Sequence, residues 1–239
     1  MTHSNLPQFS NTDQAFQHLS NRELSRAVAL FSLLGKPWLV SMGSALAKLA
    51  LALRIPVGWA VRPTVYAQFC GGESIDDSEG TIAKLAKHGV RTILDYSAEG
   101  QTDESDLDHT CIEVLATIQA ADGDARHAFA VFKVSGLSSN ALLEKVGQSL
   151  RGEAELTSEE HAAWERVQAR VRTLCEATHQ AGGRIMVDAE ESWIQDAIDA
   201  VAEDMMSDYN RDKVVVFNTV QMYRHDRLSY LKDMAARAQ

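Results

Sequence analysis

The sequence predicts an α/β protein that supplies about the first four strand–helix units of a (β/α)8 barrel after an N-terminal helical arm. Two observations predict this fold. Short apolar runs alternate with amphipathic helical segments, and each connection is long enough for a helix, which is typical of parallel strands. Each run also meets polar residues near its C-terminal end, where the loops of a barrel build the active site. The runs are residues 90–96, 128–135, 185–187 and 213–220.

The helices of the arm have recognisable start signals. Ser20 and Glu23 are spaced as in a capping box, which predicts a helix that begins at Ser20 and ends at about Leu34. Pro37 suits the first turn of a second helix, because it lacks the N–H that the first turn leaves unpaired. We expect this second helix to end at about Leu53.

One segment of the arm is apolar over about the length of a membrane span. Trp38–Val61 contains Lys48 and Arg54, and Pro56 would break a helix that crossed the bilayer. A helix that is buried, or that rests on a membrane surface or a partner, is therefore favoured over a transmembrane span. We assign the arm to residues 1–74.

The second domain, residues 75–239, contains the four strands and the helices between them. Thr157 and Glu160 form a second capping-box pattern, and Gly89 suits the end of the helix before the first strand. The predicted helices cover residues 76–87, 104–121, 140–149, 157 to about 181, about 193–205, and 224 onward.

The chain is too short to hold this arm and a complete barrel. A barrel has eight units in about 250 residues, whereas the first strand here ends near residue 96 of 239. A four-stranded sheet alone would leave its edge strands and one side of its core exposed. We therefore expect a complementary chain that carries the second half. The alternative is an open doubly wound sheet, although no G-x-G-x-x-G follows the first strand, which weighs against a Rossmann fold.

Composition excludes several classes of protein. The net charge of -10 and the isoelectric point near 5.2 argue against a nucleic-acid partner, because phosphate binding needs a basic face. Cys70, Cys111 and Cys175 are widely spaced, and no metal-binding pattern occurs, so we expect three unpaired thiols in a reducing compartment. The N-terminus does not resemble a signal peptide. We expect a cytoplasmic protein.

Five motifs occur in an order that resembles one family. They are Phe69–Glu73, Leu94–Gly100, Phe132–Leu137, Val187–Glu190 and Thr219–Tyr223. Together they resemble the N-terminal part of the monofunctional proline dehydrogenases, over about residues 31–231. The resemblance implies a distorted (β/α)8 barrel that binds FAD and oxidises L-proline to pyrroline-5-carboxylate, with electrons passed to a membrane quinone. It also implies possible peripheral contact with the inner face of a membrane.

Lys133 is the first candidate site residue. It lies among Phe129, Val131, Phe132 and Val134, where a lysine is costly to bury unless it faces an anion or a cavity. By resemblance, it binds the carboxylate of proline. The alternatives are a lysine that extends to solvent at the sheet edge and a lysine that forms a Schiff base, as in a lyase on an α/β barrel.

The other candidates follow the third and fourth strands. The resemblance implies that Asp188 organises the catalytic site, that Ala189 contacts FAD through its backbone, and that Gln221 contacts the flavin ring. A neutral amide such as Gln221 can both donate and accept hydrogen bonds there. The alternatives are a helix N-cap for Asp188 and a local backbone partner for Gln221.

Other polar residues near the strand ends also have explanations outside the site. Glu190 and Glu191 also suit the first turn of a helix, where carboxylates complement the helix dipole. Asp95 and Tyr96, at the end of the first strand, are candidates to line the pocket, and Tyr223 is expected to serve in packing.

The family has three further features later in its sequence: a basic residue beside the flavin, phosphate-binding segments, and paired arginines that bind the substrate carboxylate. None of these features occurs in this sequence. The chain is therefore expected to work as one half of an enzyme. An inactive half-barrel that serves in assembly is the non-enzymatic alternative.

Overall fold

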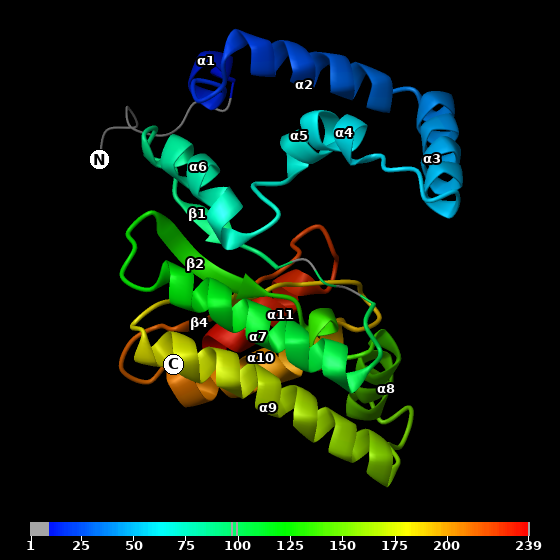
Figure 1. Cartoon of the computed structure of the whole chain (residues 1–239). Helices are drawn as coiled ribbons and strands as arrows, with labels where there is room; N and C mark the ends of the chain where they lie inside the picture. Colours follow the sequence, from blue (N-terminus) through cyan, green and yellow to red (C-terminus); the bar gives the residue numbers. More distant parts are fainter. Residues whose placement is uncertain (1–9, 97, 99, 239) are drawn as a thin grey trace. The chain divides into compact units, whose positions relative to one another are not determined.

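The computed structural model describes residues 10–96, 98 and 100–238. The chain divides into two compact units, Met1–Val90 and Arg91–Gln239 (Figure 1). Ser97 and Glu99, which belong to the second of the five motifs, lie outside the described residues. The sequence pattern places the boundary after residue 74 and so assigns the helix before the first strand to the barrel. This boundary stays a proposal.

The described part of the first unit is helical. The predicted capping box forms at the start of helix α2 (Asn21–Leu34), where the Ser20 hydroxyl accepts a hydrogen bond from Glu23 N–H at 3.3 Å and Glu23 Oε2 accepts one from Ser20 N–H at 2.7 Å. Pro37 occupies the first turn of the next helix, as expected. The helices are α1 (Thr12–Ala15), α2 (Asn21–Leu34), α3 (Pro37–Ala52), α4 (Gly58–Val61), the π-helical turn η2 (Arg62–Tyr66), α5 (Ala67–Phe69) and α6 (Ile75–Ala86).

Among the described residues, no single helix has both the length and the apolar character needed to cross a membrane. Helices α2 and α3 reach that combination only as a pair, and they are bent by 96° at the break between them.

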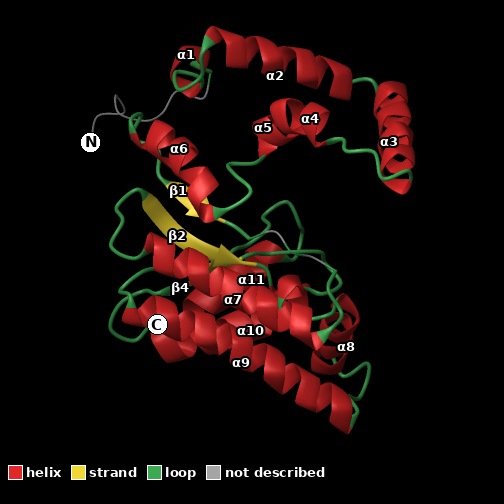
Figure 2. Cartoon of the chain, in the orientation of Figure 1, coloured by secondary structure: helices red, strands yellow, loops and turns green. Residues whose placement is uncertain are grey.

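The second unit contains a four-stranded parallel sheet in the order β1-β2-β3-β4. Helices predominate over the short strands (Figure 2), and each strand is followed by at least one helix. This repeated strand–helix order confirms the predicted α/β class. The elements are β1 (Thr92–Leu94), α7 (Glu104–Ala121), β2 (His127–Phe132), the 3-10 turn η3 (Val134–Gly136), α8 (Asn140–Leu150), α9 (Ser158–Gln180), β3 (Ile185–Val187), α10 (Gln195–Tyr209), β4 (Val216–Asn218) and α11 (Arg227–Arg237).

Several predicted boundaries were wrong. Strand β1 covers Thr92–Leu94 rather than residues 90–96, and β4 covers Val216–Asn218 rather than residues 213–220, because only these residues pair in register with the neighbouring strand. Strand β2 ends at Phe132 rather than at Ser135, because the backbone turns through η3 and Ser135 N–H bonds to the side chain of Glu190 instead of to a neighbouring strand. The last helix begins at Arg227 rather than near Arg224. The predicted bounds of α7 and β3 are confirmed.

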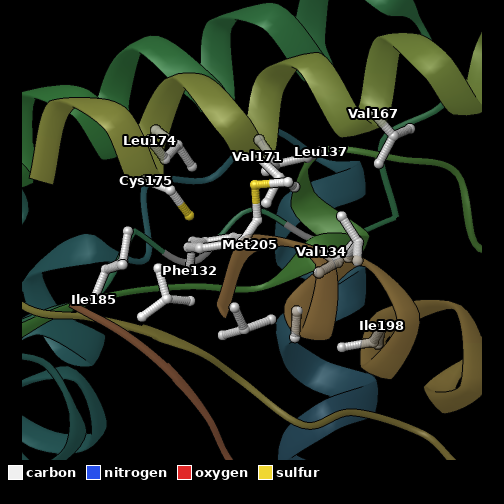
Figure 3. Close-up of a cluster of buried hydrophobic side chains, with 14 of the residues drawn as sticks. Phe132, Val134, Leu137, Val167, Val171, Leu174, Cys175, Ile185, Ile198 and Met205 are labelled. Atoms are coloured by element: carbon white, nitrogen blue, oxygen red, sulfur yellow. The ribbon is translucent and has the colours of Figure 1, made fainter. Parts of the chain in front are cut away.

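The hydrophobic core lies between one face of the sheet and the helices α7, α9 and α10. Figure 3 shows Phe132 and Ile185 from the strands together with Leu174 of α9 and Met205 of α10, all of them fully buried. Burial of a side chain of this size contributes about 1.5–3 kcal/mol. The core therefore fixes these strands and helices to one another, and with them the positions of the strand ends.

The opposite face of the sheet is half-exposed and apolar. Val131 of β2 and Met186 of β3 lie on it, and Phe129 and Phe217 meet edge to face with ring centroids 5.1 Å apart. Successive residues of a strand point to opposite faces. One face is thus covered by helices and the other is the face that lines the interior of a closed (β/α) barrel, which agrees with the predicted fold class.

Candidate active site at the C-terminal ends of the strands

The ends of β2, β3 and β4 lie side by side in register. The pairing continues one residue further, because Asp188 N–H donates to the Phe132 carbonyl oxygen at 3.0 Å and Thr219 N–H donates to the Val187 carbonyl oxygen at 3.1 Å. Lys133 directly follows Phe132. The structure therefore brings Lys133, Asp188 and Thr219 to one edge of the sheet, from three different strands.

Two of the predicted site residues, Asp188 and Ala189, are joined through Thr219, and Gln221 joins them through Ala189. Its hydroxyl accepts a hydrogen bond from Ala189 N–H at 2.7 Å and donates one to Asp188 Oδ1 at 3.3 Å. Gln221 Nε2 donates to the Ala189 carbonyl oxygen at 3.3 Å, and the Tyr223 hydroxyl donates to Gln221 Oε1 at 3.3 Å. Asp188, Ala189 and Gln221 thus form one hydrogen-bonded group across β3 and β4. Thr219 is the member whose connecting role the sequence did not reveal.

The helix-start alternatives for the acidic residues are wrong. Helix α10 begins at Gln195, and its N-cap is Ile194. Asp188 and Glu190 precede that N-cap by several residues and lie in the loop after β3, so neither one caps the helix or belongs to its first turn. Their half-buried side chains are held by other contacts.

Glu190 bonds to the turn that follows Lys133. Its Oε1 accepts a hydrogen bond from Ser135 N–H at 3.0 Å, and its Oε2 accepts one from the Ser135 hydroxyl. Burial raises the pKa of the Glu190 carboxyl, the Ser135 hydrogen bonds oppose that rise, the charge of Glu191 adds to it, and the charge of Lys133 opposes it. Lys133 is half-buried and electrostatically coupled to Glu190.

A buried polar network holds the backbone of Glu190. Glu190 N–H donates to Gln195 Oε1 at 2.8 Å, and Gln195 Nε2 donates to Asp199 Oδ1 at 2.8 Å. Asp199 Oδ1 also accepts from Asn218 Nδ2 at 3.1 Å, and Asp199 Oδ2 accepts from Arg227 Nη1 at 2.5 Å. Sequence reasoning missed this network. Gln195 and Asp199 are four residues apart on α10, but no local pattern links them to Asn218 or Arg227.

The end of β1 contributes less to this group. Tyr96 is half-buried and packs against the hydrophobic core, and Asp95 is exposed. Ser97, the next polar residue along the chain, lies outside the described residues. Within the described part of the chain, no cluster of three or more His, Cys, Asp or Glu side chains is arranged to hold a metal ion.

The parallel sheet and the position of these polar groups define an α/β protein of the barrel type, with a candidate active site at the C-terminal ends of its strands. The sequence profile of the proline dehydrogenase family matches residues 78–239. The chain belongs to this family.

Individual relatives agree with the family match. The chain is 33% identical over 170 residues to the carbapenem antibiotics biosynthesis protein CarD of Pectobacterium carotovorum subsp. carotovorum, covering 71% of this chain and 44% of that protein. It is 27% identical over 215 residues to mitochondrial proline dehydrogenase 1 of Dictyostelium discoideum, covering 76% and 38%. It is 25% identical to hydroxyproline dehydrogenase of Rattus norvegicus, covering 90% and 56%. The chain therefore spans less than two thirds of the length of these relatives.

A solved structure supports the fold. Proline utilization A from Bdellovibrio bacteriovorus, in a crystal structure of the enzyme inactivated by N-propargylglycine, superposes with a TM-score of 0.56 at 15% identity. The match covers 94% of this chain and 23% of that chain. At this identity the likeness concerns the fold, and it agrees with the barrel architecture inferred from the sheet.

Proposed function

We propose that this chain supplies the substrate-binding half of a monofunctional, FAD-dependent proline dehydrogenase, which oxidises L-proline to pyrroline-5-carboxylate and passes the electrons to a quinone. The observation that carries the proposal is the convergence of Lys133, Asp188, Ala189 and Gln221 at neighbouring strand ends in a member of this family. A Schiff-base lyase that uses Lys133 is less well supported, because family membership favours oxidation of an amino acid.

The residues at this edge fit one side of a flavin ring. The pyrimidine edge of the isoalloxazine carries both hydrogen-bond donors and acceptors. The Gln221 amide can do both, and the Ala189 carbonyl oxygen, which already accepts one hydrogen bond, has a second lone pair. Phe129 and Phe217 add an apolar surface nearby in the sheet. Bound FAD would supply the electron acceptor for removal of a hydride from the substrate.

Each residue has a distinct role in this proposal. The Lys133 ammonium binds the carboxylate of proline and so orients the ring for hydride removal. Asp188, held by the Thr219 hydroxyl, organises the polar side of the site. Ala189 and Gln221 hold the flavin edge. The pyrophosphate and adenosine of FAD, and the rest of the substrate contacts, are assigned to the second half of the barrel, carried by a complementary chain or segment.

Replacement of one lysine tests the proposal. Lys133→Ala in the complete, flavin-loaded enzyme removes the cation that faces the substrate carboxylate, and we expect KM for L-proline to rise roughly 10- to 100-fold. Lys145→Ala is the matched control, because Lys145 pairs with Glu160 on the surface of the helical layer, with 38% of its side chain exposed. An unchanged KM in Lys133→Ala would remove Lys133 from the site.

We also propose that the arm contacts an anionic membrane surface, from which the quinone is reached. Between Leu24 and Gly72 the sequence contains five basic residues and no acidic residue, although the whole chain has 33 acidic and 23 basic residues. Trp38 and Trp59 of this segment are 64% and 80% exposed. Aromatic and basic side chains on an exposed apolar helix favour binding to anionic lipid.

Vesicle flotation tests the membrane contact. We expect the protein to float with vesicles that contain anionic phosphatidylserine and to float less with vesicles of neutral phosphatidylcholine. Replacement of Lys36 and Lys48 by glutamate should reduce flotation, whereas replacement of the half-exposed Lys145 by glutamate should not. Equal behaviour of the two charge variants would contradict this proposal, and would favour the second half of the barrel as the partner of the arm.

A further inference from the structure

The turn that carries Lys133 is packed tightly on one side. Lys133 is the N-cap of η3 (Val134–Gly136), where the chain leaves β2. A Cβ atom on Gly136 would lie 2.8 Å from the Ala98 carbonyl oxygen and 3.2 Å from Thr110 Cγ2. The first distance is shorter than any normal contact of a side chain. The turn therefore has no room to shift toward α7.

Glu190 holds the same turn through one residue. Both of its carboxylate oxygens accept hydrogen bonds from Ser135, one from the backbone N–H at 3.0 Å and one from the hydroxyl. Ser135 is only 3% exposed. Hydrogen bonds to a carboxylate are stronger than those between neutral groups. Two such bonds to one residue fix both the position and the rotation of the backbone two residues after Lys133.

The loop that carries Glu190 is itself anchored. Its backbone N–H donates to Gln195 Oε1, Gln195 is 1% exposed, and the contact continues through Asp199 to Arg227 of α11. A side chain whose surroundings are packed and hydrogen-bonded keeps a single position. Glu190 is thus a fixed support rather than a mobile surface carboxylate.

We propose that Glu190 is a positioning residue, which acts through Ser135 to hold the turn after β2 so that the Lys133 ammonium meets the substrate carboxylate. The role is geometric: the carboxylate of Glu190 supplies two acceptors at a fixed place. The link to substrate binding rests on the function proposed above, whereas the hold on the turn does not.

Three variants separate the geometric role from a role of charge. Glu190→Ala removes both acceptors, and we expect KM for L-proline to rise roughly 10- to 100-fold with a smaller change in kcat, because misplacement of a binding group acts first on substrate binding. Glu190→Gln keeps both contacts, since its amide oxygen can accept from Ser135 N–H while its amide NH2 donates to the hydroxyl oxygen. We expect a KM near that of the unmodified enzyme. Glu191→Ala is the matched control, because Glu191 is the adjacent, exposed carboxylate.

A second measurement does not depend on proline. Hydrogen exchange of the peptide that contains Ser135 should be faster in Glu190→Ala than in the unmodified chain, Glu190→Gln or Glu191→Ala. If the unmodified enzyme does not oxidise proline but the exchange follows this order, the proposed function fails and the hold on the turn stands. If Glu190→Gln is as impaired as Glu190→Ala in KM, or if exchange is the same in all variants, the positioning role is overturned.

Discussion

The buried pair between Asp199 and Arg227 gives the sharpest prediction about stability. Its N–O distance is 2.5 Å, and each side chain is 8% exposed. Asp199 also accepts hydrogen bonds from Gln195 and Asn218. Asp199→Asn keeps the size of the side chain but removes its charge, so the variant leaves a buried guanidinium with one partner fewer and opens no cavity.

The expected loss in the free energy of unfolding depends on which partners Arg227 keeps. Removal of one member of a buried ion pair costs about 3–5 kcal/mol, because the other charge stays buried. Arg227 keeps a second partner, Asp226, at 2.6 Å, although that carboxylate is 49% exposed. We therefore expect the lower end of the range, about 3 kcal/mol. At roughly 2–4 °C per kcal/mol for a chain of this size, the midpoint of thermal unfolding should fall by about 6–12 °C.

A surface pair on the same helix provides the control. Asp208 of α10 bonds to Arg172 at 2.6 Å, but these side chains are 40% and 52% exposed. Asp208→Asn should lower the free energy of unfolding by about 1 kcal/mol or less. Urea unfolding followed by circular dichroism compares the two variants. Equal losses in both would refute the argument that burial, rather than the short distance, makes the Asp199–Arg227 pair important.

Three further predictions concern Glu190, Glu23 and the glycines of the arm. Burial raises the pKa of Glu190, so ionisation of this carboxyl opposes folding. The free energy of unfolding of Glu190→Gln, measured by urea titration, should therefore increase relative to that of the unmodified chain as the pH rises above 4.5. The hydrogen bond from Lys84 lowers the pKa of Glu23 to about 2, so Glu23→Gln should destabilise the arm by about 1 kcal/mol or less near neutral pH. The effect should be smaller at pH 2, where about half of the carboxyl groups are protonated in the folded chain. A Cβ atom on Gly72 would lie 2.6 Å from Ser78 N, so Gly72→Ala should lower the free energy of unfolding by about 1–3 kcal/mol. Gly43 lies in open space on α3, so Gly43→Ala should raise the free energy of unfolding by about 1 kcal/mol, and thermal unfolding compares the two variants.

The periodic parts of the fold were predictable from the sequence. Helix α7 and strand β3 have the predicted bounds, and both capping boxes form, at Ser20 and at Thr157. These features are local, because a cap depends on residues three apart and a buried strand on its own apolar run. The end of β2 was not predictable, since Ser135 bonds to Glu190, 55 positions further along the chain.

The candidate site divides in the same way. The sequence motifs include four candidate site residues: Lys133, Asp188, Ala189 and Gln221. Because these residues lie near the ends of apolar runs, the sequence predicted that they gather at one edge of the sheet. The contact through Thr219 that joins Asp188 to Ala189 was not visible in the sequence, because it crosses from one strand to the next. The network that anchors Glu190 was not visible either, because Asn218 belongs to another strand and Arg227 to a helix whose pattern gives no sign of a buried pair. Sequence patterns indicate which residues reach the edge, whereas tertiary contacts decide which of them are held still.

The central claim is that these strand ends belong to an enzyme that oxidises proline with a flavin. The most direct measurement is anaerobic addition of L-proline to the complete, flavin-loaded enzyme, with the visible absorbance of the flavin recorded. The account predicts that the absorbance bleaches as the flavin is reduced, and that Lys133→Ala needs a much higher proline concentration for the same effect. A flavin that stays oxidised at saturating L-proline, or a carbonyl substrate trapped on Lys133 by borohydride, would contradict the account.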